Sequence, residues 1–406
     1  WEMANQEAAD VLVPKDISFE DIVVDLDFHP QKDVIASGLI QGEVFIHSYS
    51  TSEKNHELMT LKHHKKACRA VKFSPNGERL FTASKDKSIQ MVDLNTGTVV
   101  KNIQKAHDEP IYSMLISDEN FISSGDDDGN IKVWDMRREG CVFDIKENDD
   151  YISDMAIDKH KRFLLATSGD GTLTAFNVRK KKMEMQSELF DSDLLSVSIM
   201  KGGEKVICGD GDGSINIFNW GEWGNMSDRF PGHPESIDCM VAISPDVVCT
   251  GSVDGIIRAV NILPNRFLGN VGEHDGFPIE SLSQSHDCKY VASCSHDQKI
   301  KFWNIEEMDK ESEKIDVRKK ATKKSKEKTL NTAANRDDFF SGFDDNTGDA
   351  DNKGSDDEES DEYGSDDIED GDSSDDEEIS DNDENSDEDE GNSDDDEANE
   401  NGVEGK

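Results

Sequence analysis

The chain is poor in the features that identify several common classes of protein. Its seven cysteines include no Cys-x-x-Cys pair, which argues against a disulfide framework or a zinc site. No apolar run approaches the roughly 18 residues of a membrane span. No phosphate-binding loop, metal-ligand cluster or nucleophile constellation is evident in the part expected to fold. We therefore expect a soluble, intracellular protein with no membrane contact, no cofactor, no metal and no small-molecule substrate.

Basic residues are also scarce, and the imbalance is concentrated at one end. The 406 residues include 44 Lys and Arg against 90 Asp and Glu, a formal charge of −46. Residues 344–406 alone hold 32 acidic and 2 basic residues, hence −30. A segment with so little apolar surface cannot offset the entropy of ordering its chain. We expect residues 344–406 to form a disordered acidic tail.

What the rest of the chain does contain is a repeat. A turn Asp is followed three residues later by Ile or Leu, and the interval between copies is about 42 residues, the length of a four-stranded propeller blade. The copies are Asp86, Asp128, Asp170, Asp212, Asp254 and Asp297. A degenerate copy, Ser37 to Phe45, places Gln41 at the Asp position. The spacing predicts an all-β fold, a seven-bladed propeller over residues 19–305.

A second signal precedes three of these copies. His64, His107 and His233 are each followed four, seven and nine residues later by apolar side chains, which is typical of an inner strand. In the third blade the polar set is His107, Ser124, Asp128 and Trp134, and the seventh blade repeats it as His274, Ser293, Asp297 and Trp303. Blades two and six keep His64, Thr82, Asp86 and His233, Thr250, Asp254 but place Val92 and Val260 at the Trp position.

These residues, with the pair Trp134-Asp135, resemble the WD-repeat family. The resemblance implies that the His, Ser, Asp and Trp side chains form a buried hydrogen-bond chain in each blade. A His beside Ser and Asp could also suggest a hydrolase triad. However, a set that recurs once per repeat is expected to be structural, since buried polar groups need partners. We therefore interpret the propeller as a binding scaffold and not an enzyme.

The sequence also indicates how the ring closes. Residues 306–311 lack the alternation of an outer strand, so we expect the N-terminal segment, residues 1–18, to supply the last blade's outer strand through Val11, Leu12 and Val13. Residues 306–343 form a linker with seven cations in eleven residues, either a nuclear targeting signal or a solvated linker. These cations are Arg318, Lys319, Lys320, Lys323, Lys324, Lys326 and Lys328.

Two further features lie in the linker and the tail. Residues 337–343, Asp-Asp-Phe-Phe-Ser-Gly-Phe, are either a short docking motif or an incidental apolar patch. Several tail serines precede acids at the spacing that an acid-directed kinase prefers, and each phosphate would add about −1.5 to −2 charges. These serines are Ser355, Ser373, Ser374, Ser380, Ser386 and Ser393.

The whole arrangement resembles a nucleolar branch of the WD-repeat family, with divergent blades, a lysine-rich stretch, an Asp-Phe-Phe segment and an acidic end. That resemblance implies a scaffold in the nucleus and nucleolus, with the cytoplasm also open, that modulates ribosomal RNA production and ribosome biogenesis. The expected partners are pre-ribosomal or other basic nuclear proteins, and direct RNA binding is left open. Two alternatives stand beside it: a substrate receptor of a cullin ubiquitin ligase, docked through Trp134, Asp135 and Arg137, or a chaperone that carries basic proteins on its tail.

Overall fold

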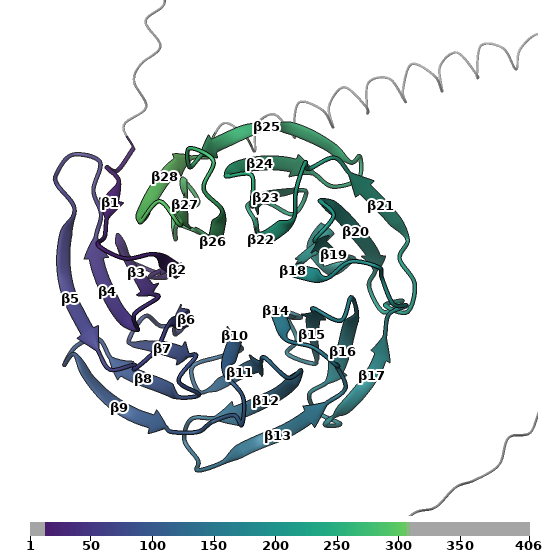
Figure 1. Ribbon diagram of the computed structural model, residues 1–406, viewed down its shortest axis with the longest axis horizontal. Coiled ribbons are helices and arrows are strands. Elements are labelled where there is room, and N and C mark those ends of the chain that lie inside the picture. The colour runs from purple at the N-terminus through teal and green to yellow at the C-terminus, as the bar shows by residue number, and fades with distance from the viewer. Residues whose placement is uncertain (1–12, 307, 309–406) are drawn as a thin grey trace, which may run out of the picture. The chain divides into compact units, whose positions relative to one another are not determined.

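A ring of seven sheets makes up the described part of the computed structural model, residues 13–306 and 308 (Figure 1). Each sheet has four antiparallel strands, and the sheets surround a common axis as the blades of a propeller do. The prediction of a seven-bladed all-β propeller is confirmed. Apart from residues 306 and 308, the predicted linker, residues 306–343 with the Asp-Phe-Phe segment, and the predicted acidic tail, residues 344–406, lie outside the described residues.

Strands run outward in chain order within each blade. Blade one holds β2 (Val23–Phe28), β3 (Val34–Leu39), β4 (Glu43–Ser48) and β5 (His56–Lys62); blade two holds β6 (Cys68–Phe73), β7 (Arg79–Ser84), β8 (Ile89–Asp93) and β9 (Thr98–Ile103). Blade three holds β10 (Ile111–Ile116), β11 (Phe121–Asp126), β12 (Asn130–Asp135) and β13 (Cys141–Lys146); blade four holds β14 (Ile152–Ile157), β15 (Phe163–Ser168), β16 (Leu173–Asn177) and β17 (Lys182–Gln186).

The remaining blades follow the same order. Blade five holds β18 (Leu194–Met200), β19 (Lys205–Asp210), β20 (Ser214–Asn219) and β21 (Asp228–Pro231), with a 3-10 turn, η1 (Lys201–Gly203), between its first two strands. Blade six holds β22 (Ile237–Ala242), β23 (Val247–Ser252), β24 (Ile256–Asn261) and β25 (Arg266–Glu273). Blade seven holds β26 (Ile279–Gln284), β27 (Tyr290–Ser295) and β28 (Lys299–Asn304), to which β1 (Ile17–Ser18) adds the fourth strand.

Burial decreases from the second strand of a blade to its outer strand. In β7 every residue except Arg79 is buried, because neighbouring blades cover both faces of the sheet there. The outer strand β9 exposes four of its six residues. The core is therefore divided among clusters between adjacent blades, such as the one that joins Leu26 and Phe28 of blade one to Phe302 of blade seven. Each blade is stabilised mainly by packing against its neighbours.

The N-terminal segment closes the ring, but not with the predicted residues. Ile17 pairs with Ile300 and Ser18 with Lys299, and the buried Ile17 side chain joins the core between blades seven and one. Val13 lies outside any strand, and the other two residues of the predicted strand, 11 and 12, lie outside the described residues. The correction has a simple cause: a two-residue strand is too short to show an apolar alternation.

The two faces of the ring carry different connections. On one face, here called the top face, lie the turns between the second and third strands and the connections from each outer strand to the next inner strand. The opposite face carries the turns between first and second strands and between third and outer strands. Within the described residues, no helix is long and apolar enough to cross a bilayer.

Candidate interaction surface

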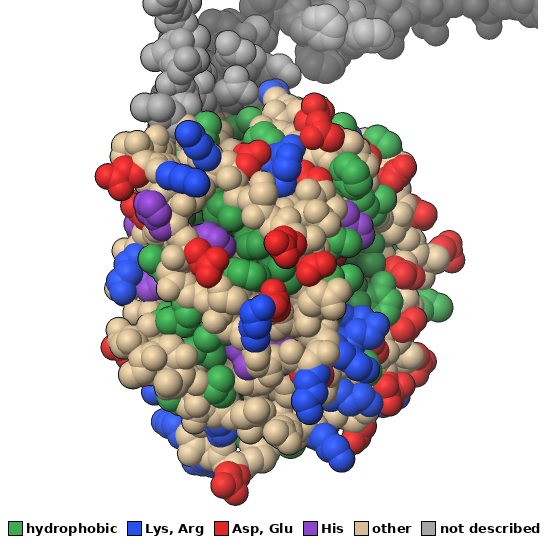
Figure 2. All heavy atoms as spheres, turned by 60° about the vertical axis from the view of Figure 1, so that its left-hand side comes forward, with side chains coloured by type: hydrophobic (Ala, Val, Ile, Leu, Met, Phe, Trp, Pro, Cys, Tyr) green, Lys and Arg blue, Asp and Glu red, His purple; other side chains and the backbone are tan. Residues whose placement is uncertain are grey.

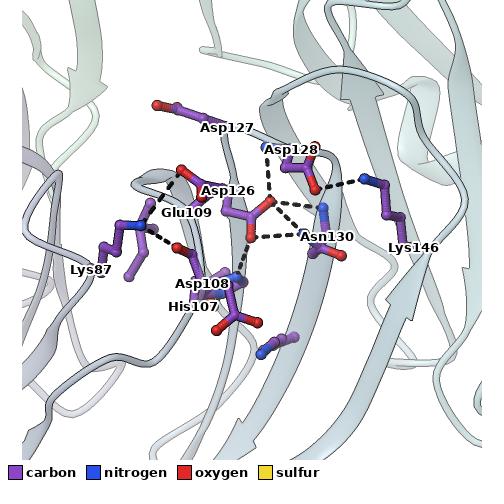
Figure 3. Close-up of polar contacts among 12 residues, drawn as sticks. Lys87, His107, Asp108, Glu109, Asp126, Asp127, Asp128, Asn130 and Lys146 are labelled. Atoms are coloured by element: carbon purple, nitrogen blue, oxygen red, sulfur yellow. Dashed lines mark hydrogen bonds and ion pairs between the residues drawn. The ribbon is translucent and has the colours of Figure 1, made fainter. Parts of the chain in front are cut away.

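A buried chain of polar side chains holds the top-face turn of blade three. His107 is fully enclosed, with Nε2 at 2.7 Å from Ser124 Oγ and Nδ1 at 2.9 Å from Asp126 Oδ2 (Figure 3). The Trp134 indole N–H donates to the same Ser124 hydroxyl at 2.9 Å. Burial raises the pKa of Asp126, but hydrogen bonds from His107 and Asn130 outweigh this effect and hold the pKa below its ordinary value. The carboxylate is therefore ionised and fixes the turn.

The acid in the buried hydrogen-bond chain of blade three is Asp126 and not the predicted Asp128. Asp126 ends β11, and its Oδ1 accepts the backbone N–H groups of both Asp128 and Asn130. Asp128 points outward and pairs with Lys146 at 2.6 Å instead (Figure 3). In blades two and four a serine ends the second strand, and the acid follows two residues later. In blade three one residue, Asp126, both ends the second strand and supplies the acid that accepts the N–H groups of the turn. Asp210 does the same in blade five.

Blade seven joins the four residues that the sequence singles out. His274 Nδ1 lies 2.8 Å from Asp297 Oδ2, and His274 Nε2 lies 2.6 Å from Ser293 Oγ. The Trp303 indole donates to Ser293 at 2.8 Å. In both this blade and blade three, the serine oxygen is occupied by a His and a Trp and is inaccessible to solvent. Such a hydroxyl has no room to attack a substrate, so its part is to hold the turn.

Blades two and six retain only part of the buried hydrogen-bond chain. His64 contacts Thr82 at 2.8 Å and Asp86 at 3.3 Å. His233 contacts Thr250 at 2.8 Å, whereas Asp254 turns to Arg258 at 2.6 Å. Val92 and Val260 occupy the Trp positions of these blades. Their side chains have no hydrogen-bond donor and pack into the core between blades.

The fixed top-face loops of blades four to six carry acids and no cations. These loops comprise residues 147–151, 169–172, 187–193, 211–213, 232–236 and 253–255, and none of these residues is Lys or Arg. Their exposed acids, here called the acidic arc, are Glu147, Asp149, Asp150, Glu188, Asp191, Asp193, Asp212 and Glu235. Leu189, the most exposed large apolar side chain described, lies in the same arc at 74% exposure. The arc therefore favours a partner that is basic and partly apolar.

Blade two gives the top face its opposite charge. Lys65, Lys66, Arg69, Lys85 and Lys87 all lie in or beside its top-face loops. Figure 2, which turns the side of β1 and β5 forward, shows one group of Lys and Arg side chains at lower right and acidic side chains along the right-hand edge. The cations of blade two and the acidic arc of blades four to six therefore divide the top face by charge. Comparing only the residue before each turn Asp does not reveal this division, because it becomes clear only when whole loops are compared.

The predicted adaptor motif lies on the opposite face. Asp135, at the end of β12, is nearly buried and accepts two hydrogen bonds at 2.8 Å from Arg137, through Nε and Nη2. The Arg137 guanidinium lies over the Phe121 ring at 5.4 Å and stays 58% exposed. Trp134 is enclosed in the core. Arg137 is therefore the member of the motif that a partner can reach.

Other residues that the sequence singles out lie beyond the described part of the chain. These are the seven cations of residues 318–328 and the six tail serines, Ser355, Ser373, Ser374, Ser380, Ser386 and Ser393. Both remain predictions. In the part of the chain that is described, no group of three or more His, Cys, Asp or Glu could hold a metal ion.

Seven four-stranded blades, two of which hold a top-face turn through buried His, Ser and Trp side chains, define a WD-repeat β-propeller. The model of the WDR55 family matches residues 14–308. The chain belongs to this family. It is 52% identical to zebrafish WD repeat-containing protein 55 over 338 residues, covering 82% of this chain and 87% of that protein. The human protein of that name is 44% identical over 296 residues, covering 73% and 77%. A Dictyostelium discoideum homologue is 38% identical over 304 residues, covering 74% and 73%.

Proposed function

We propose that this protein is a non-enzymatic scaffold of the nucleus and nucleolus that modulates ribosomal RNA production and ribosome biogenesis by binding basic proteins. The observation that carries the proposal is the acidic arc: eight exposed acids without a Lys or Arg in the same loops. Ribosomal and pre-ribosomal proteins are rich in cations, so they complement this surface. The loops are fixed from below by buried polar contacts, which favours a preformed docking surface.

The test is a rescue experiment in cells depleted of the protein. One rescue chain carries Asp149→Asn, Asp150→Asn and Asp191→Asn in the acidic arc. Its matched control carries Glu53→Gln, Glu139→Gln and Glu204→Gln, which remove the same charge from exposed positions on the opposite face. We expect the arc variant to lose about half or more of its basic nucleolar partners in affinity purification and to restore pulse-labelled pre-ribosomal RNA poorly. Full rescue by the arc variant, or a chain that stays outside the nucleolus, would contradict the proposal.

A second candidate is the substrate receptor of a cullin ubiquitin ligase. Its support is Arg137, which Asp135 fixes in one orientation while more than half of the side chain stays exposed. Purification of the wild-type chain would then recover a ligase adaptor with a cullin, and Arg137→Ala would release it. Removal of residues 344–406 tests the third possibility, a chaperone whose acidic tail carries basic cargo, because only that function depends on the tail alone.

A further inference from the structure

Four side chains gather around the ring axis on the top face, apart from the acidic arc. Arg69, Tyr112, Asp238 and Glu280 are each the second residue of an innermost strand, namely β6, β10, β22 and β26. Figure 1 shows these strands facing the axis. Each of these strands starts from the top face, so its second residue lies near that face. These four residues are called the axial site.

One half of the axial site already holds a guanidinium on an aromatic ring. Arg69 lies over Tyr112 at 4.9 Å and donates to Asp127 at 2.6 Å. Tyr112 also packs against Tyr151, with ring centroids 4.8 Å apart and ring planes tilted by 38°. Planar guanidinium groups stack well on aromatic rings and pair with carboxylates through parallel hydrogen bonds. The contact shows that arginine suits this surface.

The other half has more carboxylate than cation. Glu280 pairs with His296 at 2.6 Å, whereas Asp238 is hydrogen-bonded to Ser236 but forms no ion pair within the described residues. Burial raises the pKa of both carboxyl groups, so water only partly solvates them. The inner strands β22 and β26, which carry the two carboxylates, are neighbours in the ring, and β10, which carries Tyr112, lies across the axis from them (Figure 1). Burial and the charges of Glu280 and Asp238 raise the pKa of Tyr112, in agreement with this arrangement. A poorly solvated carboxylate without a cation gains most from a bound one.

We propose that the axial site binds an arginine side chain of a basic partner segment, with its guanidinium between Asp238, Glu280 and the exposed part of Tyr112. Tyr112 is 37% exposed, so a partner can reach it. The inference rests on the proposed binding of basic proteins and adds the residue that the partner contributes. Two carboxylates at the axis repel phosphate, so the occupant is a protein and not a nucleic acid. Arginine is preferred to lysine because it pairs with two oxygens in one plane.

The experiment uses the full chain and a fluorescent twelve-residue peptide of alternating Gly and Arg. One central Gly is replaced by a benzophenone amino acid for photocrosslinking. Control peptides carry citrulline or lysine in place of arginine. Asp238→Asn and Glu280→Gln remove the axial charges, and Asp108→Asn makes the same change in an exposed acid of the same face that belongs neither to the axial site nor to the acidic arc. Affinity is measured at about 0.15 M salt, where long-range attraction by the tail is screened beyond about 8 Å. Thermal melting checks the fold.

We expect the double axial variant to bind about tenfold more weakly than the wild-type chain, and Asp108→Asn to bind within about twofold of it. Crosslinks should map to β10, β22 and β26, and the lysine and citrulline peptides should bind more weakly. If the axial variant binds normally while neutralising the acidic arc weakens binding, the axial inference is wrong and the proposed function stands. If neither change matters, or all crosslinks map to residues 344–406, both proposals are wrong.

Discussion

Blades three and six hold the same kind of turn by different means. In blade three His107 bridges Asp126 and Ser124, and Trp134 completes a closed polar chain. In blade six the His233 side chain is hydrogen-bonded only to Thr250, and its Nδ1 has no hydrogen-bond partner among the residues described. Its ring packs instead against Phe267, with centroids 5.0 Å apart. The comparison teaches that the turn, and not the set of four side chains, is what the fold retains.

The largest expected effect separates the two histidines. His107→Ala leaves Asp126 and Ser124 buried with hydrogen bonds lost, so we expect it to lower the free energy of unfolding by about 3 kcal/mol. His233→Ala removes one hydrogen bond and an aromatic contact, for which we expect about 1.5 kcal/mol. Chemical denaturation of the two full-length variants measures both values. Equal losses would show that the closed chain of blade three adds no stability.

A second pair of substitutions tests which acid belongs to the chain of blade three. Asp126→Asn removes a buried carboxylate charge that is hydrogen-bonded to His107 and Asn130. We expect the free energy of unfolding to fall by about 2 kcal/mol. Asp128→Asn removes only an exposed ion pair with Lys146, for which we expect at most about 0.5 kcal/mol. Melting temperatures of both variants provide the measurement. A larger effect at residue 128 would restore the original interpretation.

The sequence predicted the ring well because its period is carried by one turn residue and one buried Ile or Leu in six of the seven blades. It did not choose correctly between Asp126 and Asp128. The repeat spacing selects Asp128, three residues before Ile131, whereas the acid bound to His107 is Asp126 at the end of the strand. The sequence did not predict the axial site, for a different reason. The second residues of the innermost strands include Arg69, Tyr112, Asp238 and Glu280, and such unlike residues form no repeated signature. Their common position is visible only in the folded ring.

The smallest expected effect concerns acid and distinguishes the blades again. Burial lowers the pKa of His233 from 6.5 to about 4, so between these values the unfolded chain binds the proton more tightly. His233 therefore stabilises the fold above pH 6.5, and this contribution is lost as the pH falls towards 4. The depressed pKa of Asp126 in blade three acts only below its ordinary value of 3.8. Of these two groups, His233 and not Asp126 should therefore contribute to the loss of stability between pH 7 and pH 5.

The matched variant for this effect is His233→Gln, which keeps a polar group beside Thr250 but cannot titrate. We expect the wild-type chain to lose about 1 kcal/mol more than this variant between pH 7 and pH 5, as measured by chemical denaturation at each pH. Other histidines with lowered pKa, such as His63, are present in both proteins, so their contribution cancels in the difference. Parallel pH profiles would mean that His233 accepts its proton without strain, and blade six would then be as tolerant of charge as an exposed turn.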